Sequence, residues 1–155
     1  KIFEKVYNSG VILSGVSAGA ACWFDYFLTD SFGPGLKPLS GIGLISGSFT
    51  PHYSNTKRAN KYRKNIKNKS LPNGIAIDDG VAVLFIDGKP TEVYSSRKSH
   101  NAYFINQTNC IRNIIKVSLL PSVSLYKNCS VFRCQINKFW DYCIYVFSWA
   151  ICINY

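Results

Sequence analysis

The residue whose setting most favours chemistry is Ser17, within the segment 15–20. It follows an apolar run at 11–13 and precedes an apolar and aromatic segment that extends to Leu28, an order typical of a strand, a sharp turn and a helix. A glycine stands two residues to either side of Ser17, where bulkier side chains would collide as strand and helix cross. The pattern predicts an exposed nucleophilic serine, with the N–H of Ala18 directed at a developing oxyanion.

A nucleophilic serine needs a base to take its proton, and the sequence contains two histidines. His52 follows an expected buried strand, in a kind of loop where the active-site residues of open α/β sheets gather. His100 lies in a polar loop between two expected strands near the end of the readable segment. A lone histidine is more often structural, but this location favours His52 over His100 as the base.

A carboxylate is needed to orient the base, and Asp30 is the predicted residue. It follows the helix expected after Ser17 and gives the chain order Ser, Asp, His, which is one of the known orders for this geometry. Asp25 would lie within that helix, where an exposed surface role is the simpler interpretation. Asp78 and Asp79 are typical of a turn, and adjacent carboxylates on a strand point to opposite faces.

The elements that must position these residues can be traced as far as Ile105. A short helix is expected to end near Tyr7, a helix is expected after Ser17, and a basic helix is expected at 55–69. Strands are expected at residues 11–14, 42–45, 75–77, 81–86, 91–95 and 102–105. Strands that alternate with helices and then give way to a strand-rich meander predict an α/β fold with a largely parallel sheet.

The formal net charge of +10 is concentrated in the expected helix at 55–69. Tyr62 and Ile66, four residues apart, would form its inner face, and lysines and arginines its outer face. A phosphate-binding helix is the functional interpretation, but few aromatic residues are interleaved with the charges. We therefore favour a solvated helix face, and we expect neither nucleic acid nor a membrane as a partner.

The composition changes abruptly at about Gln107. Residues 107–155 contain no glycine, every cysteine except Cys22, and a surplus of Asn, Ile, Lys, Phe and Tyr. A disulfide-bonded module, a zinc site and a membrane segment at 142–153 each fit poorly, since the cysteine spacings are irregular and the apolar run is short. We interpret this tail as an out-of-frame or disordered extension.

Three separated motifs resemble the dipeptidase E (aspartyl dipeptidase) family of serine peptidases, to which cyanophycinase is related. They are the segment around Ser17, the Pro51-His52-Tyr53 loop and the strand and turn at 74–80, and the resemblance covers about residues 1–106. It implies a three-layer, flavodoxin-like fold of the class I glutamine amidotransferase type, with no metal and no cofactor. By this resemblance Ser17 is the nucleophile and His52 the base, while the acid maps less directly to Asp30.

The resemblance also implies limits on activity. Family members have a glycine-rich turn before the nucleophile that gives the second oxyanion donor, and no such turn precedes Ser17. Because one donor is worth about 100- to 1,000-fold in rate, we expect this chain, which starts at Lys1, to be a weakly active or inactive fragment. The implied substrates are short peptides, including those with an N-terminal aspartate, and the implied location is cytoplasmic. The alternatives are an esterase of the α/β-hydrolase type and a non-enzymatic, basic nucleic-acid or membrane-surface binder.

Overall fold

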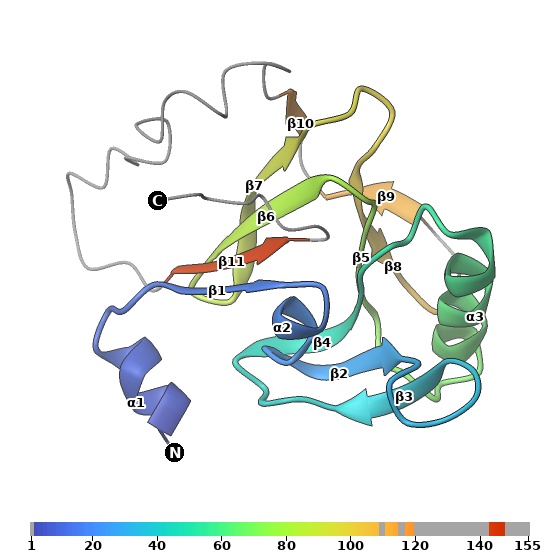
Figure 1. The fold of residues 1–155 in the computed structure, drawn as a ribbon, viewed down its shortest axis with the longest axis horizontal. Helices are drawn as coiled ribbons and strands as arrows, with labels where there is room; N and C mark the ends of the chain where they lie inside the picture. Colours follow the sequence, from blue (N-terminus) through green and yellow to red (C-terminus); the bar gives the residue numbers. More distant parts are fainter. Residues whose placement is uncertain (1, 109–110, 115–116, 120–142, 148–155) are drawn as a thin grey trace.

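The computed structural model describes residues 2–108, 111–114, 117–119 and 143–147, whose strands form two sheets (Figure 1). The six-stranded sheet has the order β3-β2-β4-β5-β8-β9, with the bounds Lys37–Ser40, Phe24–Thr29, Ile45–Thr50, Gly74–Ile77, Ala102–Ile105 and Ile111–Asn113. The five-stranded sheet has the order β1-β11-β6-β7-β10, with the bounds Leu13–Val16, Cys143–Phe147, Val81–Ile86, Lys89–Ser95 and Val117–Leu119. The helices of the described segments are α1 (Ile2–Asn8), α2 (Ala18–Ala21) and α3 (Thr56–Lys67).

Parallel strands form the centre of the six-stranded sheet. Strand β4 pairs in parallel with β2 on one side and with β5 on the other, while β3, β8 and β9 are antiparallel to their neighbours. The predicted α/β class with central parallel strands is confirmed. In a parallel arrangement, the carboxyl ends of β2, β4 and β5 meet at one edge of the sheet.

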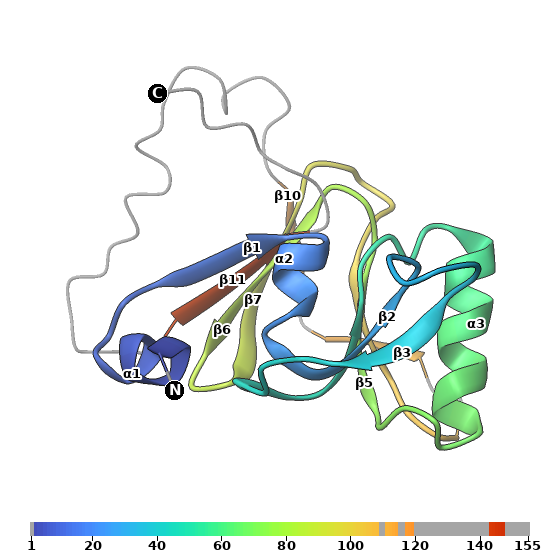
Figure 2. The ribbon, with the colours of Figure 1, turned by 60° about the horizontal axis from the view of Figure 1, so that its bottom comes forward.

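The six-stranded sheet is covered on both faces, which gives three layers (Figure 2). Helix α3 packs on one face through Tyr62 and Ile66, as expected from their spacing, and its lysines are exposed. On the other face lie α2 and the five-stranded sheet. There Phe24 stacks on Phe49 with ring centroids 4.6 Å apart and meets Phe85 edge-on at 5.7 Å. These aromatic contacts join the two sheets into one core.

The segment after Ser17 differs from the expectation of one long helix. Helix α2 ends at Ala21, and Phe24–Thr29 is strand β2 instead. An apolar, aromatic run is compatible with a helix or a buried strand, and here hydrogen bonding to β3 and β4 stabilises the strand. The next strand, β4, begins at Ile45, where the expected strand at 42–45 ends, and β3 lies within a segment expected to be a loop.

The tail that begins at Gln107 lies mostly outside the described residues. In its described parts, β9 pairs with β8, β10 with β7, and β11 with both β1 and β6. The interpretation of 107–155 as an out-of-frame or disordered extension therefore stays a prediction. Across the described segments, no helix is long and apolar enough to cross a bilayer.

Candidate active site

Ser17 lies between the end of β1 and the start of α2. Its backbone has φ 51° and ψ −110°, a conformation that residues other than glycine rarely adopt. Gly15 makes this turn feasible, because a Cβ at that position would lie 2.0 Å from the carbonyl oxygen of Gly19. The predicted strand–turn–helix geometry around Ser17 is therefore present, and backbone strain is concentrated at the candidate nucleophile.

The second glycine of the motif does not have the same steric role. A Cβ at Gly19 would meet no heavy atom within 4 Å among the described residues. The expectation that both flanking glycines relieve crowding thus holds for Gly15 alone. The backbone of Gly19 does lie close to Gly15, but a Cβ at position 19 would extend into open space.

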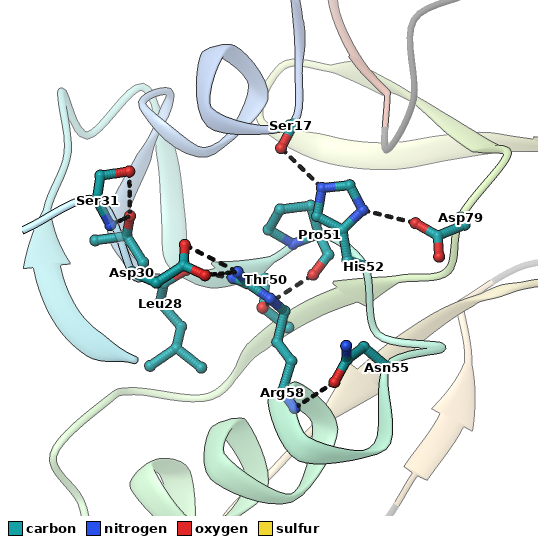
Figure 3. Close-up of polar contacts among 11 residues, drawn as sticks. Ser17, Leu28, Asp30, Ser31, Thr50, Pro51, His52, Asn55, Arg58 and Asp79 are labelled. Carbon is teal, nitrogen blue, oxygen red and sulfur yellow. Dashed lines mark hydrogen bonds and ion pairs between the residues drawn. The ribbon is translucent and has the colours of Figure 1, made fainter. Parts of the chain in front are cut away.

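His52 reaches Ser17 from the loop between β4 and α3 (Figure 3). Its Nε2 lies 2.9 Å from Ser17 Oγ, which is hydrogen-bond distance. The backbone of His52 also has a positive φ, 56°, and its carbonyl accepts a hydrogen bond from the N–H of Asn55, the residue that caps α3. A strained residue held by a helix cap places the imidazole against the serine.

The other ring nitrogen of His52 contacts Asp79. His52 Nδ1 lies 2.6 Å from Asp79 Oδ1, and both side chains are about one quarter exposed. In the neutral tautomer that fits this arrangement, Nδ1–H donates to the carboxylate and Nε2 accepts from the Ser17 hydroxyl. Ser17, His52 and Asp79 thus form one hydrogen-bonded chain in the order that nucleophilic serine catalysis requires.

Asp30 lies elsewhere and has a different partner. Both of its carboxylate oxygens lie 3.2 Å from the guanidinium of Arg58, which also donates to the carbonyl of Leu28 at 3.1 Å. The prediction that Asp30 contacts the candidate base is not met, because Ser17 and Asp79 lie at the two ring nitrogens of His52. The physical reason is that Arg58, on α3, draws the Asp30 carboxylate to an ion pair that is 63 % exposed on the aspartate side.

The position of Asp79 follows from the parallel pairing of β4 and β5. Thr50, at the end of β4, pairs with Ala76 near the end of β5. His52 lies two residues beyond the first strand and Asp79 two residues beyond the second, so both lie at the same sheet edge. The sequence signal was a pair of acidic residues after a buried strand, but their Asp-Asp-Gly setting also indicated a turn.

The remaining candidates from the sequence have structural contacts. Asp25 lies on β2 instead of in a helix, and its Oδ2 accepts from the N–H of Gly47 at 2.8 Å. Asp78 is buried and accepts from the Tyr103 hydroxyl at 3.0 Å. Burial, together with that hydrogen bond to Asp78, raises the pKa of Tyr103 to about 12. His100 lies beside the site, with Nδ1 2.6 Å from the carbonyl oxygen of Asp79.

Ala18 is the first residue of α2, and its N–H has no acceptor among the described residues. The first N–H groups of a helix have no intrahelical partner, so this donor is available to an oxyanion next to Ser17. No group of three or more His, Cys, Asp and Glu side chains that could hold a metal ion is found in the described segments. The arrangement has the geometry that acyl transfer requires, in which a proton moves from the serine to the histidine while the aspartate stays ionised and orients the imidazole.

The sequence is 44% identical over 103 residues to a protein of Bacillus subtilis (strain 168) named "Uncharacterized peptidase YgaJ". That alignment covers 66% of this chain and 44% of the relative, so the chain spans less than half the length of the curated relative. No solved structure gives a significant match. The family model of Peptidase family S51 matches residues 1–93, and the chain is therefore a member of Peptidase family S51.

Proposed function

We propose that this chain carries the catalytic residues of a serine peptidase, with Ser17 as nucleophile, His52 as general base and Asp79 as the acid that orients it. The single observation that supports this most is the unbroken hydrogen-bonded chain of Ser17, His52 and Asp79. These three residues follow strands of both sheets, and Ser17 and His52 both have a positive backbone φ. Membership of a peptidase family agrees with it.

In the proposed reaction, Ser17 Oγ attacks the carbonyl carbon of a peptide bond while its proton moves to His52 Nε2. The N–H of Ala18 donates to the carbonyl oxygen as it becomes negative, and Asp79 stabilises the imidazolium. The C–N bond then breaks, and His52 returns the proton to the leaving amine. Water then attacks the acyl carbon at Ser17 as His52 takes its proton, and the same steps release the carboxylic acid and regenerate the free serine.

The proposed substrates are short peptides, including those with an N-terminal aspartate, and this part rests on the resemblance to dipeptidase E. We also propose that the 155-residue chain turns substrate over slowly. Ala18 is the one oxyanion donor that we assign in the described segments, and a second donor is worth about 100- to 1,000-fold in rate. Because the chain spans 44% of its relative's length, the turnover of a complete family member is expected to be higher.

The proposal is tested by reaction with a serine-directed fluorophosphonate, which needs an activated serine but no complete substrate pocket. The 155-residue chain is compared with Ser17→Ala and with Ser14→Ala, a matched control on β1. We expect the parent chain and Ser14→Ala to be labelled at equal rates and Ser17→Ala not at all. Equal labelling of Ser17→Ala, or none of a parent chain that circular dichroism shows to be folded, would contradict the proposal.

A further inference from the structure

Asp79 is held by two residues that the reaction described above does not use. Ser54 Oγ lies 2.7 Å from Asp79 Oδ2, the carboxylate oxygen that does not face His52. The same hydroxyl oxygen accepts a hydrogen bond from the backbone N–H of Asp79 at 3.2 Å. Ser54 therefore donates to the carboxylate and accepts from the main chain of one residue, which fixes the Asp79 side chain relative to its own backbone.

His100 holds Asp79 from another side. Its Nδ1 lies 2.6 Å from the carbonyl oxygen of Asp79, and because a carbonyl only accepts, Nδ1 must carry the proton. The N–H of His100 in turn donates to the carbonyl of Arg97, within the loop between β7 and β8. The imidazole thereby ties the β5–β6 turn, which contains Asp79, to a neighbouring loop.

Asp79 needs such support because its position is not fixed by regular structure. It lies between β5 and β6, and its side chain is about one quarter exposed. An aspartate in a turn can rotate toward water, and any such rotation would release His52 Nδ1. Ser54 and His100 restrain the two parts of the residue that could move, the carboxylate and the peptide unit.

We infer that Ser54 and His100 are positioning residues, which act through Asp79 to hold His52 in the orientation that activates Ser17. This inference rests on the proposed function, because positioning has an effect on rate only if Ser17 reacts. Ser54 lies two residues after His52 and is exposed, so core packing does not account for its position beside Asp79.

The first test is spectroscopic and does not depend on activity. The chain has two histidines, so ¹⁵N-histidine labelling gives a spectrum with few signals. A hydrogen-bonded Nδ1–H of His52 should give a far-downfield proton signal that is protected from exchange with water. We expect this signal to be lost in Asp79→Ala, strongly broadened in Ser54→Ala and His100→Leu, and retained in Ser54→Thr and His100→Asn. Threonine keeps the hydroxyl, and an asparagine amide places a donor near the position of Nδ1.

The second test compares fluorophosphonate labelling rates. We expect Ser54→Ala to lower the rate about tenfold in the parent chain and to have no further effect in an Asp79→Ala background. Ser54→Thr should restore the rate. Ser96→Ala is the matched control, since the Ser96 hydroxyl donates to the carbonyl of Gly80, in the same turn, at 3.1 Å. Its rate should equal that of the parent.

The outcomes separate the two proposals. If the parent chain is folded but unlabelled, the proposed function fails, and the His52 signal still decides whether Ser54 and His100 position the imidazole. If the signal and the labelling rate survive in both Ser54→Ala and His100→Leu, the inference is overturned while the proposed function stands. Equal effects of Ser54→Ala with and without Asp79 would also overturn it, because such additivity shows a role that does not pass through Asp79.

Discussion

The assignment of Asp79 in place of Asp30 can be tested by one pair of substitutions, Asp79→Asn and Asp30→Asn. Each replaces one carboxylate oxygen by an NH₂ group and leaves the volume of the side chain nearly unchanged. The difference between them therefore depends on which carboxylate orients His52. It does not depend on a general loss of packing.

The size of the Asp79→Asn effect follows from the contacts of the carboxylate. The Asp79 carboxylate accepts hydrogen bonds from His52 at 2.6 Å and from Ser54 at 2.7 Å. An asparagine that keeps its oxygen toward the Ser54 hydroxyl must turn its NH₂ toward His52 Nδ1. The imidazole then takes the tautomer with the proton on Nε2, which cannot accept a proton from Ser17. We expect a loss of about 10³- to 10⁴-fold in the reaction rate of Ser17.

Asp30→Asn should have little effect. It removes an ion pair with Arg58 whose aspartate side is 63 % exposed, and such pairs contribute at most about 1 kcal/mol to the free energy of unfolding. The labelling rate of Ser17 should stay within about threefold of the parent. The assay is the second-order rate constant for fluorophosphonate labelling, with circular dichroism as the control for folding. A large loss in Asp30→Asn together with a near-normal rate in Asp79→Asn would refute the assignment.

Three further predictions concern stability. Gly15→Ala should lower the free energy of unfolding by about 3 kcal/mol or more, because the new Cβ would lie 2.0 Å from the carbonyl oxygen of Gly19. Gly19→Ala should leave the free energy of unfolding unchanged or raise it by up to about 1 kcal/mol, because its Cβ would meet no neighbour. Urea unfolding of both variants checks this. Tyr62→Phe should lower the free energy of unfolding by about 1–2 kcal/mol, measured in the same way, because the buried hydroxyl is hydrogen-bonded to Ser48 at 2.8 Å and to the carbonyl of Ile75 at 3.3 Å. The free energy of unfolding should also fall as the pH rises from about 10, the ordinary pKa of tyrosine, to about 12, the pKa of Tyr103 in the folded chain. In that window the unfolded chain binds fewer protons than the folded chain, so a rise in pH favours unfolding. Thermal melts across this range should show a shallower decline for Tyr103→Phe.

The sequence was sufficient to predict two candidate residues that the structure brings within hydrogen-bond distance. Ser17 was predicted from glycines and apolar runs within a few positions, and His52 from its place after a buried strand. The inner face of α3 followed from the four-residue spacing of Tyr62 and Ile66. Each of these depends on local spacing, which a sequence displays directly.

The aspartate that contacts His52 could not be identified in this way, because its identity depends on which strands are neighbours. Asp30 follows β2 and Asp79 follows β5, and both strands lie beside β4, whose end leads to His52. Position alone therefore left two carboxylates at one sheet edge. The contacts of the two carboxylates distinguish them, since Asp30 binds Arg58 on α3 whereas Asp79 binds Ser54. Such pairings depend on tertiary packing, as does the formation of β2 from a segment that could have been helical.

If Ser17 is a nucleophile activated by His52, as we propose, a serine-directed reagent must react at Ser17 and must need the imidazole to do so. The folded 155-residue chain is treated with the fluorophosphonate, digested and mapped by tandem mass spectrometry, alongside His52→Gln. We expect the adduct to lie on Ser17 in the parent chain and its yield to fall by at least about 100-fold in His52→Gln. An adduct on another residue, or an equal yield on Ser17 without His52, would contradict the proposal.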